Sequence, residues 1–158
     1  MQDIVDYYFS RFGDQSLDYG PIALNPNCKV VIVVPAHYEE PEFLLSSLEK
    51  CAVANAESMA ILWLINQSGA ELDQSFHLQQ EAELSERCLQ NDVPLFVRSA
   101  LNLSPKHAGV GMARKIGMDL ALEALGAINQ DGLIVCLDGD CKVSANYLEE
   151  LLQAAQRD

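Results

Sequence analysis

This sequence predicts an α/β fold with a three-layer, mostly parallel sheet, and three observations carry that prediction. From residue 29 onward, short apolar segments typical of buried strands alternate with longer segments of helical periodicity. The first apolar segment, Lys29 to Val34, is an almost unbroken run of β-branched residues, as in strands buried on both faces. The chain has 158 residues, 49% of them hydrophobic, which suits one compact domain with a sizeable core.

Residues 1–28 are expected to form an N-terminal helix and loop ahead of the α/β domain, which we place at residues 29–158. Residues 3–12 show the spacing of a short amphipathic helix, and the segment after them is rich in Gly, Pro and Asn. Pro35 ends the first strand of the α/β domain. Pro41 suits the first turn of the next helix, because its missing N–H costs nothing there.

The second and third strands are expected at residues 60–65 and 93–97, both short and apolar. The polar segment from Asn66 to Gly69 closes the second strand. Between these two strands we expect a long polar helix over residues 72–90, with an apolar stripe that begins at Leu72.

The rest of the chain continues the alternation. Residues 104–111 are expected to form a glycine-bearing loop, and residues 111–126 a helix with apolar residues at every fourth position. The fourth strand is expected at residues 133–137, and a last helix from about residue 145 to the end.

In an open parallel sheet with right-handed crossovers, ligands bind outside the carboxyl ends of the strands. The residues that follow the four predicted strands should therefore face one edge of the sheet. They are Pro35 to Glu39, Asn66 to Ser68, Arg98 to Ala100, and Asp138 to Asp140.

Asp138-Gly139-Asp140 is the most informative of these segments. Two carboxylates separated by one residue on a turn can face the same side, and proteins typically hold Mg²⁺ or Mn²⁺ with one or two carboxylates plus substrate phosphates. Gly139 lets the backbone approach a ligand closely. The pattern predicts a divalent-metal site at Asp138 and Asp140 that carries a phosphorylated ligand. The alternative is an ordinary Asp-Gly turn followed by a solvated aspartate.

Two further segments can complete such a site. Glycines before the helix at 111–126 allow backbone N–H groups to meet a phosphate, and Arg114 and Lys115 lie about one turn into that helix. After the first strand, an aromatic residue and Glu39 are suited to hold a base and a ribose hydroxyl. The alternatives are a flexible loop with a basic helix start, and an acidic helix start that complements the helix dipole.

The composition argues against several classes of partner. A net charge of −13 disfavours both nucleic acid and anionic membrane surfaces. No apolar run approaches the roughly 18 residues of a membrane span, and the first residues do not resemble a secretion signal. The five cysteines form no CxxC pair, which is typical of reduced thiols. We expect a cytoplasmic protein with no transmembrane segment in this chain.

The three segments, in this order, resemble family 2 glycosyltransferases of the GT-A fold, over roughly residues 29–152. Pro35 to Glu39 is similar to the Pro-Ala-Tyr-Asn-Glu-like motif that ends the first strand in that family. Gly109 to Gly117 is similar to its Gly-x-x-x-Ala-Arg-Asn-x-Gly-like helix start. Val135 to Asp140 is similar to its apolar strand followed by Asp-x-Asp.

The resemblance implies a Rossmann-like GT-A nucleotide-binding half. It implies transfer of a sugar, with inversion, from a nucleotide-diphosphate donor to an unknown acceptor, with Mg²⁺ or Mn²⁺ bridging the diphosphate. The expected donor-binding residues are Pro35, Ala36, His37, Glu39, Asn66, Arg114 and Asp138, and the expected metal ligands are Asp138 and Asp140.

The sequence also departs from the family. His37 and Tyr38 replace the usual Tyr and Asn, and Asn66 stands where an acidic stretch often holds the base. Asn66 can donate and accept hydrogen bonds, so the identity of the base stays open. The family's acceptor half, which carries the catalytic base, has no counterpart here, and no catalytic base is assigned. We expect the donor-binding part of a longer enzyme, inactive alone, with exposed apolar surface that favours self-association.

Two other functions remain open. A phosphohydrolase of the haloacid dehalogenase type also places Asp-x-Asp after an apolar strand. That family usually has Thr or Val where this chain has Lys142, and it needs a lysine and an acidic pair further downstream. The other alternative is a non-catalytic nucleotide-binding module that keeps the fold without the chemistry.

Overall fold

The computed structural model describes residues 1–13, 18–106 and 108–156. His107, in the predicted glycine-bearing loop, lies outside these ranges. The helices are α1 (Gln2–Phe12), α2 (Glu42–Cys51), α3 (Ser75–Ser85), α4 (Val110–Ala127) and α5 (Tyr147–Ala155), with short 3₁₀ turns at Ala56–Ser58 and Gln90–Asp92. The strands are β1 (Val30–Ala36), β2 (Met59–Ser68), β3 (Leu95–Leu103) and β4 (Leu133–Cys136).

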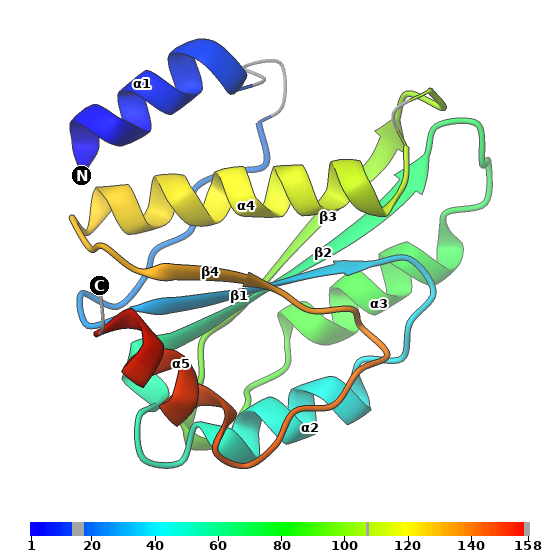
Figure 1. Cartoon of the computed structure of the whole chain (residues 1–158). Coiled ribbons are helices and arrows are strands. Elements are labelled where there is room, and N and C mark those ends of the chain that lie inside the picture. The colour runs from blue at the N-terminus through cyan, green and yellow to red at the C-terminus, as the bar shows by residue number, and fades with distance from the viewer. Residues whose placement is uncertain (14–17, 107, 157–158) are drawn as a thin grey trace.

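The four strands form one parallel sheet in the order β3-β2-β1-β4 (Figure 1). Helix α4 packs across β1, β2 and β4 on one face, and α1 lies outside α4. Helices α2, α3 and α5 lie on the other face (Figure 1). The predicted three-layer α/β fold is therefore confirmed. Strand order reverses between β1 and β4, and ligands bind at such a switch point in open parallel sheets.

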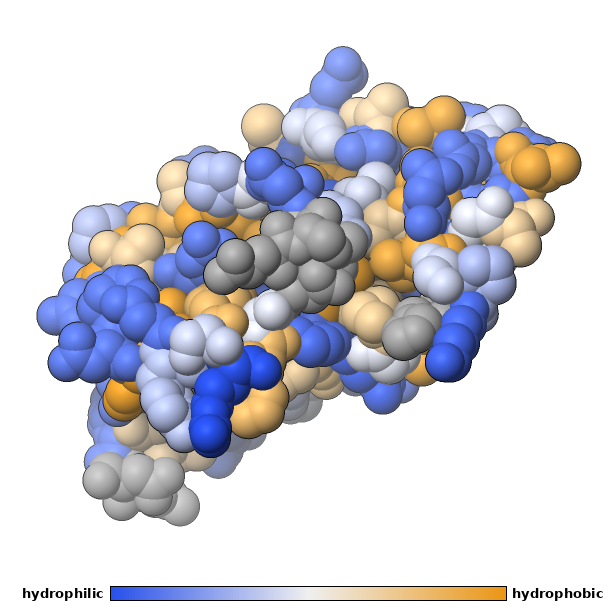
Figure 2. Space-filling view, turned by 90° about the horizontal axis from the view of Figure 1, so that it is seen from above, coloured by the Kyte–Doolittle hydropathy of each residue, from blue (hydrophilic) through white to orange (hydrophobic). Residues whose placement is uncertain are grey.

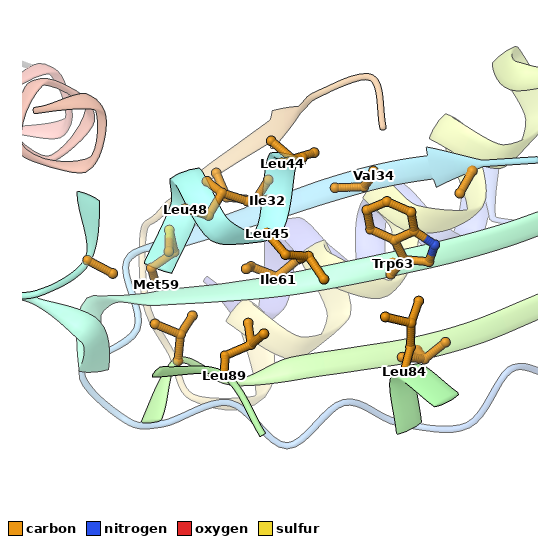
Figure 3. Close-up of a cluster of buried hydrophobic side chains, with 14 of the residues drawn as sticks. Ile32, Val34, Leu44, Leu45, Leu48, Met59, Ile61, Trp63, Leu84 and Leu89 are labelled. Carbon is orange, nitrogen blue, oxygen red and sulfur yellow. The ribbon is translucent and has the colours of Figure 1, made fainter. Parts of the chain in front are cut away.

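The central strands are buried on both faces, as the β-branched run of β1 predicts. Every residue of β1 is buried. Ile32 and Trp63 belong to the hydrophobic cluster on the α2 and α3 side (Figure 3), whereas Val33 belongs to the cluster under α4. The indole N–H of Trp63 donates to Oε1 of Gln80 at 3.3 Å, so this fully buried side chain ties α3 to the sheet.

Strands β2 and β3 run further than predicted. Asn66 lies inside β2 rather than after it, because pairing with β3 continues past the apolar run, with an irregularity between Asn66 and Ser68. Arg98 and Ser99 lie inside β3, not beyond its end. The prediction of a strand ending at residue 97 was wrong because β3 is an edge strand, where polar side chains are tolerated.

Helix α3 is shorter than the predicted span of 72–90. Leu72, the expected start of its apolar stripe, lies before the helix and is 94% exposed. Asp73 accepts hydrogen bonds from the N–H and the hydroxyl of Ser75 at 2.9 and 2.7 Å. This local turn precedes the helix and keeps the segment around Leu72 out of it.

The N-terminal segment packs against the α4 face. The hydroxyl of Tyr8 donates to Oδ1 of Asp119 at 2.8 Å, and Ile22, Leu24 and Cys28 are buried in the cluster under α4. Figure 2, which looks down on the α1 side, shows apolar residues interspersed with hydrophilic ones. Within the described residues, no helix is both long enough and apolar enough to pass through a membrane.

Candidate functional site

A cleft of about 330 Å³ opens at the carboxyl edge of the sheet, where the strands end. Its strand-side wall is formed by Pro35, His37, Glu39, Asn66, Ser68 and Glu71. Its other wall is formed by Pro105, Ala108, Gly109 and Val110, where the chain enters α4. Four of the residues predicted to bind a nucleotide donor therefore line one cleft: Pro35, His37, Glu39 and Asn66.

Asn66 is held in one orientation at the floor of this cleft. Its Nδ2 donates to the carbonyl oxygen of Ala36 at 2.7 Å. Because a carbonyl oxygen can only accept a hydrogen bond, the amide nitrogen and not the amide oxygen must face Ala36. Ala36 itself is fully buried and contributes this carbonyl rather than a side chain to the site. Asn66 is only 6% exposed. Its Oδ1 has no hydrogen-bond partner among the described residues, and this oxygen is not one of their fully buried atoms that lack a partner. Because Asn66 lines the cleft and its Nδ2 is engaged by Ala36, Oδ1 is the group of this side chain that remains to accept a hydrogen bond from a ligand.

Glu39 lines the cleft and makes hydrogen bonds to the turn after β1 and to α3. Its Oε2 accepts the backbone N–H of His37, and its backbone carbonyl accepts Nε2 of Gln80 at 3.0 Å. Gln80 is the same residue that binds the indole of Trp63. The turn after β1 is thus held by the Glu39 carboxylate, which accepts the His37 N–H, and by Gln80 of α3, which donates to the Glu39 carbonyl.

Gly139 packs the Asp138–Asp140 turn directly against Glu39. A Cβ on Gly139 would lie 2.9 Å from Cβ of Glu39 and 3.4 Å from the ring of Trp63. The described glycines with positive φ are Gly20 and Gly109, so Gly139 is not required for a left-handed turn. Close packing is the reason for glycine here, and this packing places the carboxylate pair beside the cleft wall.

Substituting Gly139 is expected to separate these two segments. In Gly139→Ala, the new methyl group meets Cβ of Glu39, which cannot rotate away, and overpacking of this kind costs about 1–3 kcal/mol. Urea unfolding measures the change. In a double-mutant cycle, Glu39→Gly and Gly139→Ala should show a favourable coupling energy, because the clashing Cβ is removed. A Gly139→Ala protein as stable as wild type would contradict the close contact.

Arg114 and Asp138 form an ion pair across the β1–β4 switch point. Nη2 of Arg114 lies 2.5 Å from Oδ1 of Asp138, and their side chains are 42% and 61% exposed. Such an exposed pair contributes little to stability. The ion pair matters because it joins the first turns of α4 to the acidic turn after β4. The Nε of Arg114 is buried without a partner among the described residues.

The start of α4 presents backbone donors to the cleft. Gly109 precedes the helix with φ 133°, a conformation that favours glycine, and no side chain caps the helix. Val110, the first helical residue, lines the cleft. The first N–H groups of a helix have no intrahelical acceptor, and they are favourable partners for an anion.

The carboxylates of Asp138 and Asp140 are the groups at this turn that could contribute oxygen ligands to a metal ion. Both residues are exposed, and hard oxygen donors of this kind suit Mg²⁺ or Mn²⁺. Within the described residues, no group of three or more His, Cys, Asp or Glu side chains is arranged to hold a metal ion. Two carboxylates alone would suit an ion that takes its remaining ligands from phosphate and water, which is the usual arrangement for Mg²⁺.

A cluster of rings backs the cleft behind His37. His77 is fully buried, with its ring centroid 4.8 Å from that of Tyr38 and 5.1 Å from that of His37. Neither ring nitrogen of His77 has a hydrogen-bond partner among the described residues. Burial lowers the pKa of His77, and His37 lowers it further, while Glu71, Asp73 and Glu39 oppose the shift. His77 is therefore held neutral.

This buried histidine should make the fold sensitive to acid. Its folded-state pKa lies below the unfolded value of about 6.5, so the unfolded chain takes up the proton first as the pH falls. Stability should fall below about pH 6.5. His77→Phe, which keeps the ring packing without the nitrogens, should lose less stability between pH 7 and pH 5. Urea unfolding at both pH values measures this, and an unchanged pH dependence would contradict the assignment.

Sequence reasoning missed Glu71 as a residue of the site. Glu71 lies three residues beyond the end of β2, and its Oε2 is 3.6 Å from Nε2 of His37 across the cleft wall. Because the strand was predicted to end at residue 65, its site residues were expected at Asn66 to Ser68, which is too early in the chain. The signal available was an acid directly after Gly69-Ala70, which closes the strand.

Comparison with known proteins adds no relative to this description. No model of a known protein family matches the chain, and no curated protein matches it.

Proposed function

We propose that this chain binds a nucleotide-diphosphate sugar through Mg²⁺ or Mn²⁺, as the donor-binding part of a glycosyltransferase. One observation carries the proposal. The Asp138–Asp140 turn packs through Gly139 onto Glu39 and pairs through Asp138 with Arg114. The acidic turn at the β1–β4 switch point thus lies beside Glu39, which also lines the cleft over β1 and β2, and ligands bind at this edge of the sheet in this architecture.

The cleft suits the nucleoside part of the donor. Asn66 offers a fixed acceptor, and the carboxylate of Glu39 is suited to a ribose hydroxyl, since carboxylates accept hydrogen bonds from hydroxyl groups. Pro35 and His37 line the same wall. Ala36 supports this wall from within through its carbonyl group.

The diphosphate part belongs between the acidic turn and the start of α4. A divalent ion held by Asp138 and Asp140 would neutralise the negative charge of the diphosphate as it leaves the sugar. In the free protein, Arg114 offsets the charge of Asp138. If a cation were held by that carboxylate, the guanidinium of Arg114 would be available to pair with phosphate oxygens, for which its planar geometry is suited.

Titration calorimetry with nucleoside diphosphates, with Mn²⁺ and with a chelator, tests the proposal. We expect binding that requires the metal, because the acidic turn alone repels a diphosphate. Binding that is equally tight in the chelator would contradict the metal-bridged donor site and favour a nucleotide-binding module without transfer chemistry. Trapping of a phosphoaspartate at Asp138 would instead indicate the phosphohydrolase.

A further inference from the structure

On the β2 side of the cleft, away from the backbone donors of α4, Asn66 and Glu71 supply hydrogen-bond acceptors. Asn66 lines the cleft, and with its Nδ2 bound to the Ala36 carbonyl its Oδ1 remains as a hydrogen-bond acceptor. Glu71 adds a carboxylate on the same wall, with one oxygen 3.6 Å from His37. Asn66 lies in β2 and Glu71 just after it, on the wall away from the acidic turn at the end of β4. A ligand that fills this part of the cleft must present donors to it.

The four common bases differ in what they offer to such a wall. Uracil presents one N–H between two carbonyl oxygens, so its carbonyls would face Glu71 and Asn66. Cytosine and adenine each present one amino group beside a ring nitrogen that only accepts. Guanine alone presents two adjacent donors, the N1–H and the 2-amino group, which match a carboxylate as a pair.

We propose that the cleft is selective for guanine nucleotides, with Glu71 accepting from N1–H and the 2-amino group and Asn66 accepting from the same edge. This inference rests on the proposed function, since it assigns the base of the same donor. It also includes a repulsive element, because the carbonyl groups of uracil would lie against a carboxylate. The nearly buried Asn66, whose amide cannot flip without losing its hydrogen bond to Ala36, is the observation that sets the direction of recognition.

Titration of the whole chain with GDP, IDP, UDP, CDP and ADP in the presence of Mn²⁺ tests the inference. GDP is expected to bind roughly 10-fold to 100-fold more tightly than UDP, the range of one good bidentate base contact. IDP, which keeps N1–H but lacks the 2-amino group, should bind about 10-fold more weakly than GDP. Glu71→Gln should reduce the ratio of GDP to UDP affinity by about 10-fold, while Glu86→Gln, an exposed glutamate after α3, should leave it unchanged.

The outcomes separate this inference from the proposed function. Metal-dependent binding in which UDP, CDP or ADP equals or exceeds GDP would overturn guanine selectivity and leave the donor site standing. Equal affinity for GDP and IDP, or a Glu71→Gln variant with the wild-type ratio, would also overturn it. Failure of every nucleotide to bind would overturn both.

Discussion

Asp140→Ala should weaken Mn²⁺-dependent binding of a nucleoside diphosphate by roughly 10-fold to 100-fold. Removing a group that only supports a metal ligand already weakens metal binding by this much, and Asp140 is expected to be a ligand itself. The carboxylate is exposed and has no hydrogen bond or ion pair that the described structure would lose, so its removal should leave the fold intact. The effect should therefore appear in calorimetric titrations without a change in the free energy of unfolding.

Asp131→Ala is the matched control for this variant. Asp131 is an exposed aspartate just before β4, at the opposite end of the same strand. It removes the same charge from the chain without touching the carboxyl edge. Equal losses in the two variants would show that the overall charge, not the position of Asp140, governs binding.

Gly117→Ala should destabilise the fold by about 1–2 kcal/mol, although alanine favours helices over glycine by about 1 kcal/mol. A Cβ on Gly117 would lie 2.3 Å from Cγ1 of Val33, where α4 crosses β1. Val33 is fully buried, and its branched side chain has few alternative rotamers. Helix and strand must therefore move apart, which urea unfolding will detect as a lower free energy of unfolding.

Gly111→Ala provides the control within the same helix. A Cβ at Gly111 meets no atom within 4 Å, so this change should stabilise the protein by about 0.4–1 kcal/mol. Val33→Ala combined with Gly117→Ala should show a favourable coupling energy in a double-mutant cycle, because the clashing methyl group is removed. Similar effects of Gly117→Ala and Gly111→Ala would contradict the close crossing of α4 over β1.

The sequence was sufficient to predict the fold because hydrophobic periodicity and burial agree along the chain. The β-branched residues of β1 form a doubly buried central strand, and the helical spacing after Gly109 gives α4. It was insufficient for β3, whose polar residues resemble a loop. Edge position makes them acceptable in a strand, and edge position is set by the order of the whole sheet.

The candidate site was predictable in part. The end of β1 and Asn66 do line one cleft, because parallel strands bring their carboxyl ends to one edge. The ion pair of Arg114 with Asp138 and the packing of Gly139 on Glu39 depend on where β4 enters the sheet. Glu71, in the β2–α3 connection, and His77, in α3, join the site through tertiary packing, which local patterns do not reveal.

The most direct test of the account is to observe the metal and the diphosphate together on the protein. Electron–nuclear double resonance of Mn²⁺ with the chain and GDP should show ³¹P coupling in a protein-bound complex. In that complex, carboxylates and phosphates share the ion. Asp138→Asn and Asp140→Asn should each reduce its formation. A Mn²⁺–GDP spectrum that does not change when the chain is added would contradict a metal-bridged donor site at Asp138 and Asp140.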